Sequence, residues 1–161
     1  MRLIYTKPIL KDLSQGSRIA FVRQFRLMTQ DEVSDKLGIT GECKRRTMTR
    51  YEKGNRNPKE VRRQEIAEIL NINVNAIKEY NYKDSMDIIY TLMWLEEIIP
   101  NYNIDLSDVP NINSVNIALI KKCLNRWNIM KNRRARREIS YEDYIEWKLN
   151  YDFKEEINSY E

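Results

Sequence analysis

The residues best suited to chemistry lie between Leu37 and Pro58, in the stretch LGITGECKRRTMTRYEKGNRNP, which holds six Lys or Arg residues and two acids. Within KRRTMTRYEK, the only apolar side chain is Met48 and the only aromatic one is Tyr51. Guanidinium groups form bidentate, charge-assisted hydrogen bonds with phosphates and with guanine. A short helix with so many of these groups and so little to bury indicates a surface for a polyanion. The alternative is a helical surface whose cations are merely solvated.

Other kinds of chemistry have little support in the sequence. The chain has no histidine, and Cys43 and Cys123 form no close-set pair, so a disulfide framework and a Cys/His zinc site are both unexpected. There is no Gly-rich phosphate loop, and we interpret the carboxylates of Glu96 and Glu97 as solvated. We therefore expect no enzymatic activity, no cofactor and no metal, and we interpret Cys43 as an incidental small residue rather than a redox sensor.

Composition and charge indicate an all-α protein with two dissimilar parts. The chain has 161 residues, of which 42% are hydrophobic and 32% charged, with only 4 Gly and 4 Pro. Residues 1–83 hold 18 Lys and Arg against 10 Asp and Glu, whereas residues 84–161 hold 10 against 14. A basic part joined to an acidic part is typical of a polyanion-binding module that carries a second module. We see no signal peptide and no apolar run near the roughly 20 residues of a membrane span, and we expect a cytoplasmic protein.

The N-terminal half reads as a short arm and five helices. The arm would cover residues 1–16, and the helices would cover residues 17–26, 29–37, 45–53, 59–70 and 73–77. Thr29 with Glu32 forms a capping-box pattern, Gly38 is a helix stop, and Asn73 is a cap for the last helix. These elements place the arginine-rich segment on the third helix of a domain that we assign to residues 17–83.

In this arrangement the sequence resembles the helix-turn-helix domain of Cro and the phage repressors, the XRE family. The resemblance covers roughly residues 17–80 and rests on several motifs in the right order: Arg23, TQDEV at 29–33, LGIT at 37–40, TMTRYEKGNRNP at 47–58 and IAEIL at 66–70. Two departures stand out. Four extra residues, 41–44, lengthen the turn before the third helix, and Leu27 stands where many members have glycine and must either adopt the left-handed conformation or end the helix differently.

The resemblance implies that the third helix enters the major groove of double-stranded DNA. Met48 and Tyr51 would then face the core, and the base-contacting residues would be Arg45, Arg46, Thr49 and Arg50. It also implies phosphate contacts from Arg23, Gln30, Lys44, Asn55 and Arg56. By the same resemblance Arg23 pairs with Glu52, so that this arginine has two possible roles.

The second half carries no motif that we can assign to a family. The sequence of this half predicts three helices. The first covers residues 85–99 and is followed by a connection over residues 101–112, and the second is long, starting at Asn113 and ending in the basic run 131–137. The third is capped by Ser140 with Asp143 and reaches Phe153. Its aromatic and apolar side chains suit either the core of a small bundle, which is the simpler interpretation, or a dimer or partner interface, for which the candidates are Leu124, Trp127, Tyr144 and Trp147. The basic run is either a second phosphate patch or a set of cations that stabilises the helix dipole.

These patterns predict a sequence-specific DNA-binding transcriptional regulator, a repressor that binds a two-fold operator as a homodimer. The alternative is a protein-interaction function in which residues 84–161 bind and inhibit another protein, as an antitoxin or an inhibitor of a defence nuclease does, while the DNA-binding half only regulates its own promoter.

Overall fold

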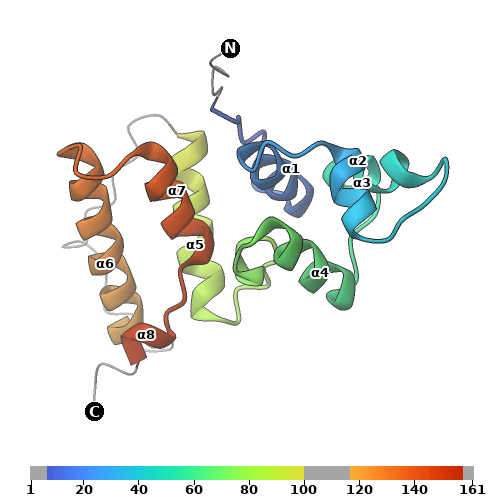
Figure 1. The fold of residues 1–161 in the computed structure, drawn as a ribbon. Coiled ribbons are helices and arrows are strands. Elements are labelled where there is room, and N and C mark those ends of the chain that lie inside the picture. The colour runs from blue at the N-terminus through green and yellow to red at the C-terminus, as the bar shows by residue number, and fades with distance from the viewer. Residues whose placement is uncertain (1–6, 100–116, 158–161) are drawn as a thin grey trace. The chain divides into compact units, whose positions relative to one another are not determined.

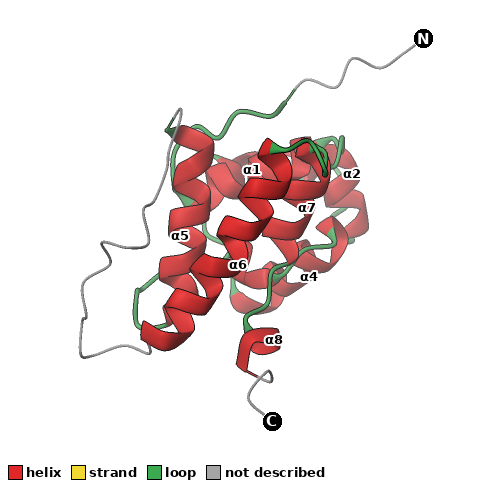
Figure 2. Ribbon diagram, turned by 90° about the vertical axis from the view of Figure 1, so that its left-hand side faces the viewer, coloured by secondary structure: helices red, strands yellow, loops and turns green. Residues whose placement is uncertain are grey.

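The computed structural model describes residues 7–99 and 117–157, and every regular element in these two ranges is a helix (Figure 2). This confirms the predicted all-α class. The chain divides into two compact units, Met1–Glu79 and Tyr80–Glu161, which we call unit 1 and unit 2. The division lies four residues before the boundary that the sequence predicts.

The helices of each unit follow one another along the chain (Figure 1). Those of unit 1 are α1 (Gln15–Phe25), α2 (Gln30–Lys36), α3 (Lys44–Glu52), α4 (Glu60–Leu70) and the 3-10 helix η1 (Val74–Ala76). Those of unit 2 are α5 (Ser85–Ile98), α6 (Ile117–Ala135), α7 (Tyr141–Asn150) and α8 (Lys154–Ile157). The predicted cap at Asn113 and the predicted connection over residues 101–112 lie outside the described residues.

Local sequence signals account for several helix ends. Thr29 and Glu32 form a complete capping box at the start of α2, and Ser140 and Asp143 form one at the start of α7, as predicted. The backbone N–H of Thr29 and its hydroxyl both donate to the Glu32 carboxylate, which lowers the pKa of Glu32. Gly38 follows α2 with a φ of 70°, which is the expected left-handed stop.

Three predicted boundaries were wrong. α1 begins at Gln15, not Ser17, because the hydroxyl of Ser14 accepts the Ser17 N–H and caps the helix two residues earlier. The predicted fifth helix is only the three-residue η1, although Asn73 does cap it. The predicted helix through Phe153 ends at Asn150, where Tyr151 becomes extended and its carbonyl accepts a hydrogen bond of 2.7 Å from the buried Tyr90 hydroxyl.

The core of unit 1 brings α1 and α3 into direct backbone proximity. Gly16 lies in the first turn of α1, and a Cβ added there would stand 2.4 Å from the carbonyl oxygen of Tyr51 and 2.6 Å from that of Glu52. No other residue type fits at this distance without moving one of the helices. Around this approach lie fully buried apolar side chains: Ile19, Val22, Val33, Met48, Ile66 and Leu70. The third helix is thus fixed against the first by packing as well as by polar bonds.

Arginines stabilise the ends of other segments in unit 1. Arg18, only 2% exposed, donates to the carbonyls of Leu13 (3.1 Å), Ala76 (2.8 Å) and Lys78 (2.7 Å). Arg26 donates to the carbonyl of Leu70 at the end of α4 (2.7 Å). In the same way, Arg62 donates to the carbonyl of Leu37 at the end of α2 (2.9 Å). The carbonyls of Leu70 and Leu37 lie at the ends of α4 and α2, where the last C=O groups of a helix have no acceptor role inside it.

Leu27 follows α1 in the left-handed conformation, with a φ of 55°, and its side chain is 66% exposed. The predicted strain at this position is therefore present, since a left-handed conformation costs a residue with a Cβ about 1–2 kcal/mol. The geometry is that of a helix end: the N–H groups of Leu27 and Met28 return to the carbonyls of Gln24 and Arg23.

Candidate nucleic-acid interface

The third helix, α3, has two chemically different faces. Met48 is fully buried and Tyr51 is 5% exposed, so both face the core as predicted. Arg45, Arg46 and Arg50 are exposed on the other side of the helix. Within the described residues, none of these three guanidinium groups has a hydrogen-bond or ion-pair partner. The helix therefore presents three uncompensated positive charges, each with a fork of N–H donors.

A polar network fixes this helix to α1 and α2. Arg23 meets Glu52 through two bonds, of 2.5 Å from Nε and 3.0 Å from Nη2, and the side chains are only 12% and 9% exposed. The remaining nitrogen of Arg23, Nη1, donates to the carbonyl of Met28 (2.8 Å). The Gln30 amide donates to Glu52 (2.8 Å) and accepts from the hydroxyl of Thr49 (3.0 Å). The pairing of Arg23 with Glu52 that the resemblance implies is confirmed.

The same network limits what three of the predicted DNA contacts can do. All the nitrogens of Arg23 are engaged inside unit 1, and both ends of the Gln30 amide are occupied. The hydroxyl of Thr49 has two acceptors within reach, Gln30 and the carbonyl of Arg45, each at 3.0 Å. For these side chains an external contact would require sharing or giving up an internal bond. Their evident role in the structure is to hold α2 and α3 at a fixed distance.

The other predicted phosphate contacts surround the exposed face. Lys44 begins α3 and forms an ion pair with Asp35 of α2. Asn55 and Arg56 are exposed in the loop after the helix, where Gly54 has a φ of 73° and the Arg56 N–H donates to the carbonyl of Arg50 (3.2 Å). We call the side of α3 that carries Arg45, Arg46 and Arg50 the arginine face. Asn55 and Arg56 thus lie at its C-terminal end and Lys44 at its N-terminal end.

The lengthened turn before α3 is fastened at both ends. The Ile39 N–H donates to the carbonyl of Ser34 (3.0 Å), and the buried hydroxyl of Ser34 donates to the carbonyl of Lys44 (2.8 Å). Between these bonds, the side chains of residues 40–43 are exposed. Three of the four extra residues, 41–43, therefore form a loop, Lys44 begins α3, and α3 keeps the register in which Met48 and Tyr51 face the core.

The candidates for an interface in unit 2 lie mostly in its interior. Leu124 and Trp127 are each 2% exposed and Tyr144 is 4% exposed, whereas Trp147 is only half-buried. The indole N–H of Trp127 donates to the Tyr144 hydroxyl (2.7 Å), which in turn donates to Glu96 (2.8 Å). Burial and the nearby Glu96 carboxylate raise the pKa of Tyr144, so it remains a neutral donor. The first three residues are core residues of the bundle, which is the simpler of the two interpretations.

Several cations of unit 2 have acidic neighbours. Lys148, with a side chain only 6% exposed, donates to Glu97 (2.9 Å). In the basic run at the end of α6, Arg133 and Arg136 lie 3.6 and 3.9 Å from the carboxylate of Glu138. Glu96 and Glu97, which sequence reasoning left as solvated carboxylates, are in fact partners of tyrosines and lysines on α6 and α7.

Sequence reasoning missed the structural residues Gly16, Arg18, Arg26, Ser34 and Arg62. An interior helical glycine is a usable signal for a close approach, and Gly16 could have been found in that way. The arginines offered none, because all the carbonyls that they bind, except that of Leu13, lie 25 to 60 residues away along the chain.

No family model, curated protein or solved structure matches the chain. No helix in the described ranges is long and apolar enough to cross a membrane. The same residues contain no group of three or more His, Cys, Asp or Glu side chains that could hold a metal ion.

Proposed function

We propose that the protein is a sequence-specific DNA-binding transcriptional regulator that reads the major groove with α3. The observation that carries the proposal is the set of three exposed guanidinium groups, on Arg45, Arg46 and Arg50, without partners among the described residues. A buried methionine and tyrosine hold the opposite face of the same helix in the core. Arginine forks fit the O6 and N7 atoms of guanine, so we expect guanines in the bound site.

The residues around this face are suited to contact the phosphates of the DNA backbone. Lys44, Asn55 and Arg56 flank the helix at its two ends, where phosphates would pass if the helix lay in the groove. Unit 1 as a whole holds 17 Lys and Arg against 10 Asp and Glu, which favours approach to a polyanion. The Arg23–Glu52–Gln30–Thr49 network keeps the geometry of α2 and α3 constant, and this supports recognition by rigid docking.

We further propose that the protein acts as a repressor and binds as a homodimer. A single short helix reads few base pairs, and regulators of this kind bind two half-sites about one helical turn apart through two-fold dimers. Light scattering of the full chain, alone and with DNA, tests this part: a dimer on a DNA of two half-sites is expected, and one monomer per site contradicts it.

The test of DNA binding is fluorescence anisotropy with DNA from upstream of the protein's own gene and with random DNA, each over a salt series. Arg50→Ala is expected to lose about 1–3 kcal/mol on the specific DNA and much less on random DNA. Arg126→Ala, an exposed arginine of unit 2 outside the basic run, is the matched control and should change binding by less than about 0.5 kcal/mol.

Two results would contradict the assignment. If wild type binds upstream and random DNA equally, α3 does not read base edges. If Arg50→Ala and Arg126→Ala weaken binding equally and change only the salt dependence, the arginines act as unspecific phosphate contacts.

A further inference from the structure

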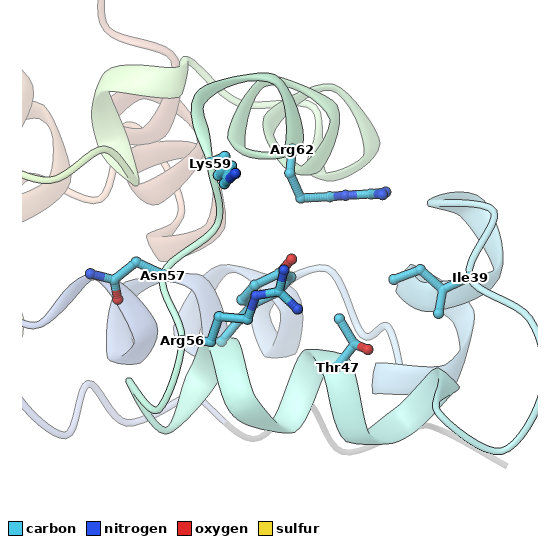
Figure 3. Close-up of a pocket in the computed structure, with 7 residues that line it drawn as sticks. Ile39, Thr47, Arg56, Asn57, Lys59 and Arg62 are labelled. Atoms are coloured by element: carbon cyan, nitrogen blue, oxygen red, sulfur yellow. The ribbon is translucent and has the colours of Figure 1, made fainter.

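A second basic site lies beside α3, on the flank that faces α4. It is a pocket of about 390 Å³, within the size range of small-molecule sites. Figure 3 shows Arg56 and Thr47 on the α3 side, with Lys59 and Arg62 opposite them and Ile39 at one end. Asn57 and Tyr51 complete the lining. No acidic side chain lines the pocket.

Two of its three cations are available to a ligand. Arg56 and Lys59 are exposed, and neither side chain has an ion-pair or hydrogen-bond partner among the described residues. Arg62 already donates to the carbonyl of Leu37 and pairs with Glu65 at 3.0 Å. The net charge offered to a ligand therefore comes from Arg56 and Lys59.

Tyr51 adds a hydroxyl donor to this site. The residue is 5% exposed, it lines the pocket, and its hydroxyl has no hydrogen-bond partner within the described ranges. Lys59 is also the N-cap of α4, an eleven-residue helix without a side-chain cap, so its first N–H groups have no side-chain acceptor.

We propose that this pocket binds the phosphate group of a small phosphate ester. Arg56 and Lys59 neutralise the phosphate, the Tyr51 hydroxyl donates a hydrogen bond to it, and the organic part lies against Ile39. The cations together with Ile39 fit a ligand that carries both a phosphate and an organic group, such as a nucleotide. A phosphate of the DNA backbone has the same anionic chemistry, and the experiment separates the two sources.

The first arm uses no DNA. The full chain is titrated with AMP, with adenosine and with inorganic phosphate, and binding is followed by amide NMR shifts and by calorimetry. AMP is expected to bind with a Kd of about 1 mM or lower and to shift the amides of residues 56–62, while adenosine binds at least about tenfold more weakly because it lacks the anion. Inorganic phosphate should shift the same amides.

Three variants assign the residues. Lys59→Gln should weaken AMP binding about three- to tenfold, and Tyr51→Phe, which keeps the ring and hence the packing, about two- to fivefold. Arg46→Gln is the matched control, because it removes a cation from the outer face of α3 and does not line the pocket; its affinity for AMP should equal that of wild type. Far-UV circular dichroism verifies that each variant is folded.

The proposal is overturned if neither AMP nor phosphate binds below about 10 mM, since a site with two cations should be stronger than that. It is also overturned if AMP shifts residues 45–50 instead of 56–62, or if Arg46→Gln weakens binding as much as Lys59→Gln.

The second arm rests on the proposed function, because Arg56 would serve both the pocket and the DNA backbone. Saturating AMP should then weaken binding to the upstream DNA, and Lys59→Gln should reduce this competition. If AMP binds but the protein has no affinity for DNA, the proposed function fails and the pocket remains. If the phosphate of DNA alone occupies the pocket, Lys59→Gln weakens DNA binding while free AMP has no effect, and the small-ligand proposal fails.

Discussion

The two units differ in the number of their cations and in how they use them. Unit 1 has 17 Lys and Arg against 10 Asp and Glu, whereas unit 2 has 11 against 14. In unit 2, Arg126 pairs with Glu156 (3.1 Å) and Lys148 with Glu97 (2.9 Å). On α3 of unit 1, three exposed arginines have no such partner among the described residues. The number of arginines in a segment thus says little about binding; the presence of acids within reach decides whether their charge remains available.

Unit 1 itself holds a second group of arginines that resembles those of unit 2. Arg18, Arg26 and Arg62 donate to backbone carbonyls at the ends of elements, and Arg23 is paired with Glu52. The contrast therefore lies between inward arginines, which should matter for stability, and outward ones, which should matter only for an external anion. The following variants test this contrast in order of expected effect.

Replacing the buried arginine should have the largest effect. Arg18→Met keeps the length of the side chain but leaves the carbonyls of Leu13, Ala76 and Lys78 without their donor, so the free energy of unfolding of unit 1 should fall by about 3 kcal/mol. All three tryptophans of the chain lie in unit 2. Chemical unfolding followed by tryptophan fluorescence should therefore change little, while far-UV circular dichroism shows the loss.

The control for this variant is Arg46→Met on the outer face of α3. It should leave the free energy of unfolding within about 0.5 kcal/mol of wild type. An equal loss in both variants would refute the division into inward and outward arginines.

Breaking the partly buried ion pair between Arg23 and Glu52 should have the next largest effect on stability. Glu52→Gln leaves the Arg23 guanidinium, at 12% exposure, without its anion, and we expect a loss of about 2 kcal/mol, between the values for exposed and buried pairs. The comparison in unit 2 is Glu138→Gln, whose carboxylate and the nearby Arg133 are each 47% exposed. That variant should cost less than about 0.5 kcal/mol by tryptophan fluorescence, and a larger cost would mean that the basic run of α6 depends on its acid for folding.

Both units end a helix with a side chain in the left-handed conformation, Leu27 after α1 and Arg137 after α6, with φ values of 55° and 60°. Replacing either by glycine relieves about 1–2 kcal/mol of strain and adds backbone entropy to the unfolded chain, so a net gain of about 0.5 kcal/mol is expected. The gain in stability is measured by thermal unfolding, followed by circular dichroism for Leu27→Gly and by tryptophan fluorescence for Arg137→Gly. A loss at Leu27 would show that its exposed side chain stabilises unit 1.

The smallest effect concerns the two capping boxes. Hydrogen bonds from the Thr29 backbone N–H and hydroxyl lower the pKa of Glu32, and those from the Ser140 hydroxyl and backbone N–H lower the pKa of Asp143. A lowered pKa in the folded state contributes stability that is present above the unfolded pKa and is lost as the pH falls through the folded value. The contributions should therefore disappear below the ordinary values of 4.5 for Glu32 and 3.8 for Asp143.

Unfolding measured from pH 7 to pH 3 tests this for each unit with its own probe. Glu32→Gln and Asp143→Asn should each lose less stability on acidification than wild type does. An identical acid dependence in wild type and variant would contradict the assignment.

The features that could be predicted from the sequence are those whose causes lie within a few residues. The capping boxes at Thr29 and Ser140, the stop at Gly38 and the inward face of α3 follow from side chains three or four positions apart. The partners of Arg18, Arg26 and Arg62 could not be predicted, because tertiary packing alone brings distant carbonyls to them. The hydrogen bond from the Thr49 hydroxyl to the Gln30 side chain could not be predicted either, because it depends on the distance between α2 and α3.

The fastened turn before α3 has a consequence for how such a chain can evolve and be engineered. Its two ends are bonded to Ser34, while the side chains of residues 40–43 between them project into solvent. The position of α3 therefore does not depend on the length of this loop, so residues can be gained or lost there with little penalty. The loop is the natural place to insert a tag or a fluorophore-bearing peptide next to the arginine face, and the most accessible point for a protease to nick unit 1.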